Sequence, residues 1–152
     1  MGKFTAKKLN KFLFFKLPSA YFTGIRVISI DDKEAMATVK HKWINQNPFN
    51  SLYWAVQGMA SELVTGILVM KKIDESKKKI SMLVTYQTGT FTKKAKGIIT
   101  FTCKDGDKIK DAIDKTIATG EGQTVVMTAE GFNEEFESVS YFEYTWSVKV
   151  KQ

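Results

Sequence analysis

Hydrophobic positions change their spacing several times along the chain, and each spacing predicts a different element. Residues 1–18 place leucines and phenylalanines among lysines at helical intervals, which predicts an amphipathic helix ending at a proline. Residues 21–30 are rich in β-branched and aromatic side chains, and residues 35–43 alternate apolar and polar positions. The Asp-Asp-Lys segment at 31–33 is a turn signal, so the two strands are predicted to form a hairpin.

The longest apolar stretch, residues 51–70, contains a single charged residue, Glu62. Its length favours a helix over a strand, and Asn50 or Ser51 is expected to cap its start. A helix that is apolar on almost every side must be buried on almost every side, so this segment is predicted to be the central helix. Polar residues in its middle argue against a membrane span: Gln57, Ser61, Glu62 and Thr65.

The second half of the chain predicts four more strands and a short helix. Strands are expected over residues 80–92, 97–103, 123–130 and 139–150, and a helix over residues 107–119 that stops at Gly120. Hairpins joined in this order build an antiparallel sheet. The chain is therefore predicted to be one α+β domain, residues 1–152, in which about six antiparallel strands wrap a long central helix.

Composition narrows the possible partners. The chain carries 23 basic and 16 acidic residues, a net charge of +7, but only one arginine, Arg26. Bidentate recognition of bases and phosphates uses the arginine fork, so no nucleic-acid partner is expected. The lysines are predicted to form a solvated surface, or to attract an anionic small molecule such as a nucleotide-bearing thioester.

One histidine and one cysteine, His41 and Cys103, restrict the chemistry further. They exclude a structural zinc with four Cys or His ligands and a disulfide within the chain, so we expect no metal and no cofactor.

The lysine-rich N-terminal helix has two interpretations: docking on the domain's own core, or contact with a membrane surface. Because Lys16 interrupts the apolar run, no secretory signal and no stable membrane insertion are expected, and the expected location is the cytoplasm.

Glu62 is the most unusual feature of the predicted central helix. Burying an unpaired carboxylate costs several kcal/mol, and such groups concentrate at active sites. Gly58, Glu62 and Gly66 share one helical face, and a polar stripe lies next to it, so another chain or a ligand can approach closely there. The structural alternative is an ion pair between Glu62 and a lysine or Arg26.

The start of the central helix is a second candidate site. Its free backbone amides and positive dipole end favour an oxygen that gains negative charge. The segment from Trp43 to Glu62, WINQNPFNSLYWAVQGMASE, resembles the hotdog-fold acyl-CoA thioesterases, and is most similar to their branch called domain of unknown function 4442. In that superfamily a loop Asn is followed three residues later by Gly. A His-Gly-Gly sequence begins six residues after the Asn, and an acidic residue stands fifteen residues after it. Asn47 and Glu62 match, whereas Asn50 replaces the Gly and Tyr53-Trp54-Ala55 replaces His-Gly-Gly.

The resemblance implies a hotdog fold that pairs into a homodimer or a dimer of dimers, with the acyl-CoA or related thioester between subunits. It implies that Glu62 acts as base or nucleophile, that Asn47 orients water or the carbonyl, and that the Ala55 amide polarises the carbonyl. The residues expected to bind substrate are Asn50, Tyr53, Trp54, Ser61 and Lys93.

Two other functions stay open. The first is a hotdog module that holds a fatty acyl or other apolar ligand without turnover, because Trp54 and the missing His depart from the superfamily pattern. The second is an adaptor that uses the lysine-rich N-terminus to bind a membrane surface or a nucleic acid.

Overall fold

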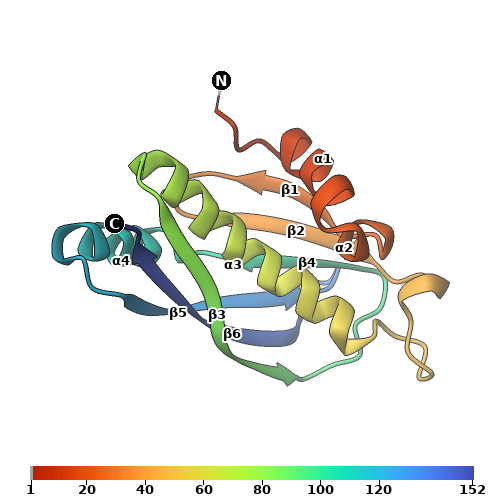
Figure 1. Ribbon diagram of the computed structural model, residues 1–152. Helices are drawn as coiled ribbons and strands as arrows, with labels where there is room; N and C mark the ends of the chain where they lie inside the picture. The colour runs from red at the N-terminus through yellow and green to blue at the C-terminus, as the bar shows by residue number, and fades with distance from the viewer. Residues whose placement is uncertain (1) are drawn as a thin grey trace.

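A long helix, α3 (Trp54–Ser76), runs along one face of a strongly twisted six-stranded sheet (Figure 1). This computed structural model describes residues 2–152. The other helices are α1 (Ala6–Lys16), α2 (Pro18–Phe22) and α4 (Gly106–Thr119), with a 3₁₀ turn at Trp43–Asn45. The strands are β1 (Arg26–Ile30), β2 (Ala35–Lys40), β3 (Ile80–Phe91), β4 (Ile98–Cys103), β5 (Gln123–Phe132) and β6 (Ser138–Val150).

The predicted α+β architecture is confirmed, with all six strands antiparallel in the order β1-β2-β4-β5-β6-β3. The β1–β2 and β5–β6 hairpins form as the sequence indicates. However, β3 and β4 do not form a hairpin: β4 lies between β2 and β5, and β3 pairs only with β6 at the edge. Sequence order therefore predicted the strands but not the pairing of these two.

The N-terminal region departs from prediction at one point. Pro18 opens the second helix, α2, and its fixed φ suits the first helical position. Residues 21 and 22, predicted as strand, are therefore helical, and β1 begins at Arg26. The amphipathic interpretation of α1 is confirmed: Leu9 and Leu13 are buried in the core, and the Asn10 side-chain amide exchanges two hydrogen bonds with the Val27 backbone.

The predicted boundaries of the central helix were wrong at both ends. Helix α3 starts at Trp54 because its preceding residues are held extended: the Leu52 amide donates to Ala95 and the Tyr53 amide to Asn45. The helix cap is Tyr53, which makes no side-chain capping bond, rather than Asn50 or Ser51.

The strand predicted over residues 35–43 ends at Lys40, so Trp43 is 84% exposed instead of facing the core. The Asn45 side chain turns the chain there by bonding the Thr23 and Lys40 carbonyls and the Lys42 amide.

Polar groups on α3 are matched to aromatic residues on β6. The Ser61 hydroxyl lies 2.6 Å from the Tyr144 hydroxyl, and the Trp146 indole N–H donates to Thr65 Oγ1 at 2.9 Å. Gly66 lets the Trp146 ring approach, because a Cβ there would lie 3.3 Å from it. These contacts explain most of the small polar face of the helix by packing within the chain.

Thr65→Val is expected to lower the free energy of unfolding by about 1–2 kcal/mol, because a nearly isosteric change leaves the buried Trp146 N–H without an acceptor. Thr65→Ser keeps the hydroxyl and is the matched control. Urea unfolding curves of the three proteins measure the effect, and an equal loss in both variants would show that the lost hydrogen bond to Trp146 is not its cause.

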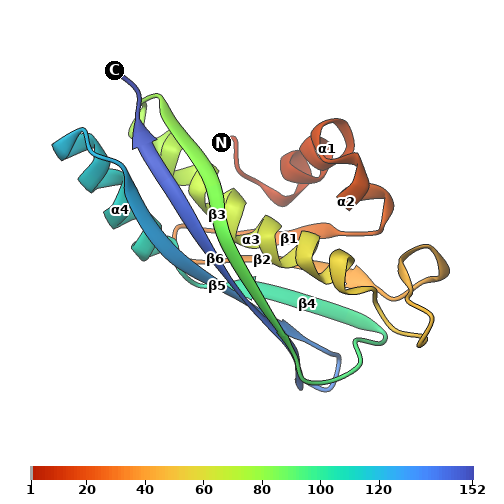
Figure 2. The same cartoon turned by 60° about the horizontal axis from the view of Figure 1, so that its bottom comes forward.

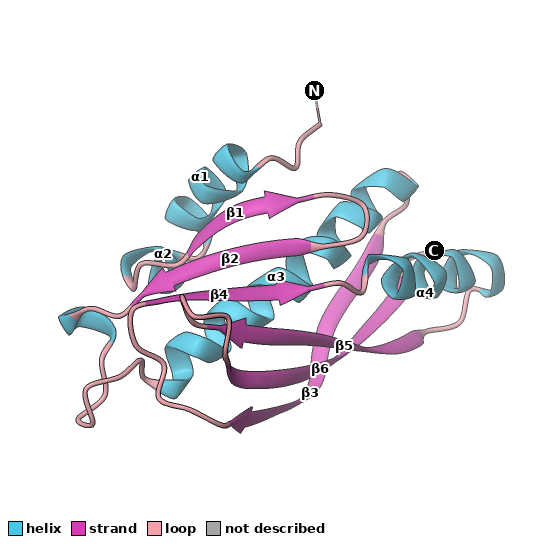
Figure 3. Ribbon diagram, turned by 180° about the vertical axis from the view of Figure 1, so that it is seen from behind, coloured by secondary structure: helices cyan, strands magenta, loops and turns pink. Residues whose placement is uncertain are grey.

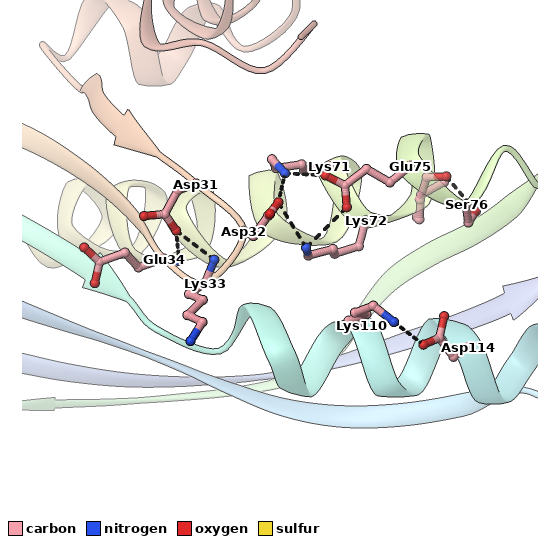
Figure 4. Close-up of polar contacts among 11 residues, drawn as sticks. Asp31, Asp32, Lys33, Glu34, Lys71, Lys72, Glu75, Ser76, Lys110 and Asp114 are labelled. Carbon is pink, nitrogen blue, oxygen red and sulfur yellow. Dashed lines mark hydrogen bonds and ion pairs between the residues drawn. The ribbon is translucent and has the colours of Figure 1, made fainter.

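A second contact region joins the β1–β2 turn to the far end of α3 (Figure 4). Asp31 Oδ1 accepts from the Lys33 and Glu34 amides, and Asp32 pairs with Lys71 and Lys72. The hydrogen bond from Lys71 is the main reason that the pKa of Asp32 is lowered. These contacts connect the first hairpin to the C-terminal half of α3.

The remaining helices lie on either side of α3 (Figure 2). Helix α4 lies near the end of α3, and helices α1 and α2 lie beside β1 and the first half of α3. From behind, the face of the sheet away from α3 is open over most of its width (Figure 3). No helix in residues 2–152 is long and apolar enough to cross a membrane.

Candidate active site

The loop before α3 is organised by the side chain of Asn47. Its Oδ1 accepts from the backbone amides of Phe49 and Ser51, and its Nδ2 donates to Ser51 Oγ at 2.9 Å. Asn50 follows with φ +58°, in the left-handed region that glycine and asparagine tolerate best. This geometry explains why Asn is tolerated at position 50, where the hotdog thioesterases that the sequence resembles have Gly.

The first amides of α3 are free donors. Within residues 2–152, the Val56 and Gln57 amides bond to the Tyr53 carbonyl, while those of Trp54 and Ala55 have no acceptor. Such amides at a helix start, with the positive end of the helix dipole behind them, can stabilise an oxyanion.

A pocket of about 500 Å³ opens beside this helix start. It brings together four of the predicted residues: Asn47, Tyr53, Trp54 and Lys93. The Lys93 ammonium pairs with Glu137, and the Lys94 ammonium lies 3.4 Å from the Phe49 carbonyl oxygen. The pocket is thus apolar along Phe49, Leu52 and Phe91, with two cations at one edge.

Gln57 is a pocket residue that the sequence did not single out as a site. It is 4% exposed, and its Oε1 is buried without a hydrogen-bond partner among the described residues. Ser61 and Thr65, on the same stripe, find partners on β6, whereas Gln57 faces the pocket. The polar stripe was visible in the sequence, but only the strand positions show which of its members lacks a partner.

Glu62 lines a second, smaller pocket of about 250 Å³. Its neighbours there are mostly apolar and come from α3 and the α1–α2 junction: Leu17, Pro18, Ala20, Met59 and Leu63, with Lys16 and Ser19. Burial raises the pKa of the Glu62 carboxyl above its ordinary value.

The predicted structural alternative for Glu62, an ion pair, is not observed. In the described part of the chain the Glu62 carboxylate takes part in none of the ion pairs and accepts no side-chain or backbone hydrogen bond. Arg26 instead stacks over the Tyr21 ring at 3.6 Å and donates to the Tyr21 carbonyl. The carboxylate is therefore available to a water or a ligand.

The Tyr144 hydroxyl is hydrogen-bonded to neighbours of Glu62 on α3, the Ser61 hydroxyl and the Gly58 carbonyl. Burial, opposed by the Ser61 hydrogen bond and supported by the charge of Glu62, raises the pKa of Tyr144 to about 12. Ser61 is fully buried and lines neither pocket, so its predicted contact with substrate stays a prediction. Burial also raises the pKa of the Cys103 thiol to about 12, which makes that cysteine a poor nucleophile.

The two pockets lie apart along α3. Ala55 and Glu62 are seven positions apart in the sequence, which corresponds to about 10 Å along a helix axis. A base must be within about 3 Å of the proton that it takes. One copy of the chain therefore does not bring Glu62 and its own helix start to the same reacting atoms.

Comparisons with known proteins find one matching family and several similar solved structures. The family described as Domain of unknown function (DUF4442) matches residues 5–148. No curated protein matches the chain.

A protein of unknown function from Chlorobaculum tepidum aligns with a TM-score of 0.82 at 18% identity, over 96% of this chain and 94% of its own. A Pseudomonas aeruginosa protein named a probable thioesterase aligns with a TM-score of 0.82 at 18% identity, over 99% of this chain and 100% of its own. A Haemophilus influenzae thioesterase aligns with a TM-score of 0.75 at 17% identity, over 98% of this chain and 93% of its own. At these identities the likeness shows the fold, and it confirms the predicted hotdog architecture.

Proposed function

Because this chain belongs to the DUF4442 family and has the hotdog fold, we propose that it hydrolyses an acyl-CoA or a related acyl thioester. The observation that carries the proposal is the Glu62 carboxylate, half-buried in an apolar pocket without a protein partner. A carboxylate in such surroundings is a stronger base than one in water, and it has room for a water beside it.

The proposed reaction uses Glu62 as general base. Glu62 takes a proton from a water whose oxygen attacks the thioester carbonyl carbon, and the carbonyl oxygen becomes an oxyanion. The C–S bond then breaks, and the leaving thiolate takes the proton from Glu62. The free amides of Trp54 and Ala55 stabilise the oxyanion, a contribution worth about 10²–10³ in rate when one such donor is lost.

Asn47 enters this proposal as a positioning residue. Its side chain is fully used in holding the loop that precedes α3, so it sets where the helix amides point. Tyr53, Trp54 and Gln57 form the wall of the helix-start pocket, and Lys93 and Lys94 supply cations for the phosphates of a CoA carrier. When a CoA carrier binds, the Lys93 ammonium leaves its ion pair with Glu137 and pairs with a phosphate instead.

The proposed active unit is a homodimer, in which Glu62 of one copy meets the helix start of its partner. Two observations support it besides the separation of the pockets. The edge strand β3 exposes Leu83 and Tyr86 at 65% and 64%. Gly58, on the Glu62 face of α3, has nothing within 4 Å of the position of a Cβ, so a second chain or a substrate can approach there. We place this activity in the cytoplasm.

A chain-length panel of acyl-CoA substrates tests the activity, and mixed dimers test the shared site. Ala55→Pro removes one helix-start amide, and Glu62→Gln removes the base; each variant alone is expected to be nearly inactive. After the two are unfolded together and refolded, half of the dimers are mixed and have one intact site, so about a quarter of wild-type activity should return if two-fold pairing is correct. No recovery in a mixture that contains mixed dimers would contradict a shared site.

A second function is favoured by Trp54, which is 54% exposed on the wall of the helix-start pocket where the superfamily has no side chain. In this alternative the chain binds a fatty acyl or similar apolar ligand without turnover. Tight binding of acyl-CoA together with no hydrolysis across the panel would support it over the hydrolase.

A further inference from the structure

Nearly all of the excess positive charge lies at the N-terminus. The first 30 residues contain no Asp or Glu and six basic residues: Lys3, Lys7, Lys8, Lys11, Lys16 and Arg26. The remaining 122 residues are almost balanced, with 17 basic against 16 acidic residues. The positive end of the molecule is therefore helix α1 with the residues just before it, together with the start of β1.

These N-terminal cations are largely unpaired. Lys3 pairs with Asp74, but within residues 2–152 no carboxylate lies in ion-pair contact with Lys7, Lys11, Lys16 or Arg26. Lysines elsewhere, such as Lys71 and Lys110, do pair with acids. These unpaired charges are therefore available to an anionic partner.

The same helices expose a cluster of large apolar side chains. Phe15 and Phe22 are 65% and 59% exposed, and Phe14 and Leu17 are about two-fifths exposed. The Phe14 ring contacts Phe15 at 4.9 Å and Phe22 at 5.9 Å between centroids, so these side chains form one patch. Exposed apolar patches rimmed by charge mark interaction sites.

A pocket of about 520 Å³ joins the charges to the aromatic rings. It is lined by Lys7, Lys11, Phe14, Tyr21 and Arg26, with Asn10. The Arg26 guanidinium is already fixed over the Tyr21 ring, so the pocket presents three cations around an aromatic wall. That arrangement suits a phosphate group.

The patch is held rigidly and faces outward. Leu9 and Leu13 bury the opposite side of α1 in the core, and Asn10 bonds both polar groups of the Val27 backbone. Figure 2 shows α1 and α2 at one side of the molecule, away from α4 and from the edge strand β3. The apolar cluster is thus not needed to seal the domain's own core.

We propose that α1 and α2 form a peripheral docking surface for a membrane that contains anionic phospholipid. Phosphates of the headgroups bind at Lys7, Lys11 and Arg26, and Phe15, Leu17 and Phe22 enter the boundary between headgroups and acyl chains. Cations beside aromatic and aliphatic side chains on a short amphipathic helix are the combination that binds this boundary. RNA fits less well, because the patch has a single arginine and a large apolar surface.

The surface adjoins the Glu62 pocket, since Lys16 and Leu17 also line that pocket. Docking would bring the opening of the pocket to the membrane, where long acyl groups partition. The docking itself does not depend on the proposed hydrolysis, and vesicle binding and hydrolysis are measured separately.

Vesicle sedimentation of the full chain tests the docking. We expect binding to phosphatidylcholine vesicles with about 30% phosphatidylglycerol, at least about 10-fold weaker binding to pure phosphatidylcholine, and release by salt. The double variant Lys7→Glu/Lys11→Glu should weaken binding to the anionic vesicles about 30-fold or more. Lys104→Glu/Lys115→Glu makes the same change of net charge on an exposed, distant surface and should bind within about threefold of wild type.

Phe15→Ser/Phe22→Ser separates lipid docking from plain charge attraction. It should also abolish most vesicle binding, with circular dichroism unchanged, because both rings are exposed. Equal binding to neutral and anionic vesicles, or equal loss in the control pair, overturns the proposal. So does binding of inorganic phosphate or an RNA oligonucleotide that vesicles do not displace, or self-association that the Phe variant removes.

Discussion

Glu62→Gln is expected to lower kcat for acyl-CoA hydrolysis by about 10²–10⁴, the range that a positioned general base contributes. The change keeps the size of the side chain and removes its ability to take a proton, so KM should change little. Single-substrate kinetics on the best acyl-CoA of the panel measures it. Met59→Leu, a change in the same pocket, is the matched control and should stay within a few-fold of wild type.

The pH dependence of kcat/KM is an independent test of the role of Glu62 as the base. Because burial raises the pKa of Glu62, the wild-type kcat/KM should rise with pH through that raised pKa as the base ionises, and the Gln variant should lack this rise. Equal kcat values for wild type and Glu62→Gln would remove Glu62 from the mechanism and leave the ligand-binding alternative.

Stability should change with pH in the opposite direction. A folded carboxyl with a raised pKa binds its proton more tightly than the unfolded chain does, so its contribution is most favourable below the ordinary value of 4.5. That contribution is lost as pH rises from the ordinary value to the raised one. From acidic to neutral buffer, wild type should therefore lose more stability than Glu62→Gln, a difference that thermal melts of the two proteins report.

Gly106→Ala is expected to lower the free energy of unfolding by about 2–3 kcal/mol, at the upper end for overpacking. A Cβ at this position would lie 2.2 Å from the Asp32 carbonyl oxygen and 2.7 Å from Lys33 Cα. Both are backbone atoms of the β1–β2 turn, and the Lys33 carbonyl also accepts a hydrogen bond from the Gly106 amide, so the turn cannot move away cheaply. At this chain length the loss corresponds to a fall in Tm of roughly 5–10 °C.

Gly58→Ala is the matched control for Gly106→Ala. It makes the same chemical change inside α3, where nothing lies within 4 Å of the new Cβ, and should raise stability by up to about 1 kcal/mol from helix propensity. Differential scanning calorimetry of both variants measures the contrast. A small loss in Gly106→Ala would mean that α4 and the β1–β2 turn can separate.

The elements of this fold were predicted where the sequence carries a local period. The amphipathic helix at the N-terminus, the long apolar helix and the alternating strand β6 each follow from side chains that must share one face. Element boundaries failed where contacts distant in sequence decide them. The start of α3 depends on Ala95 and Asn45, and the exposed position of Trp43 depends on the end of β2.

The candidate site divides in the same way. The sequence alone determined that Glu62 stands in the middle of an apolar helix and that Asn47 precedes the helix start by a fixed spacing, because helical geometry makes both local properties. Tertiary contacts place Asn47 and Glu62 in separate pockets, leave Gln57 with an unpartnered oxygen, and pair β3 with β6. Those outcomes depend on which distant strand packs against each face of α3, and local side-chain spacing carries no information about that choice.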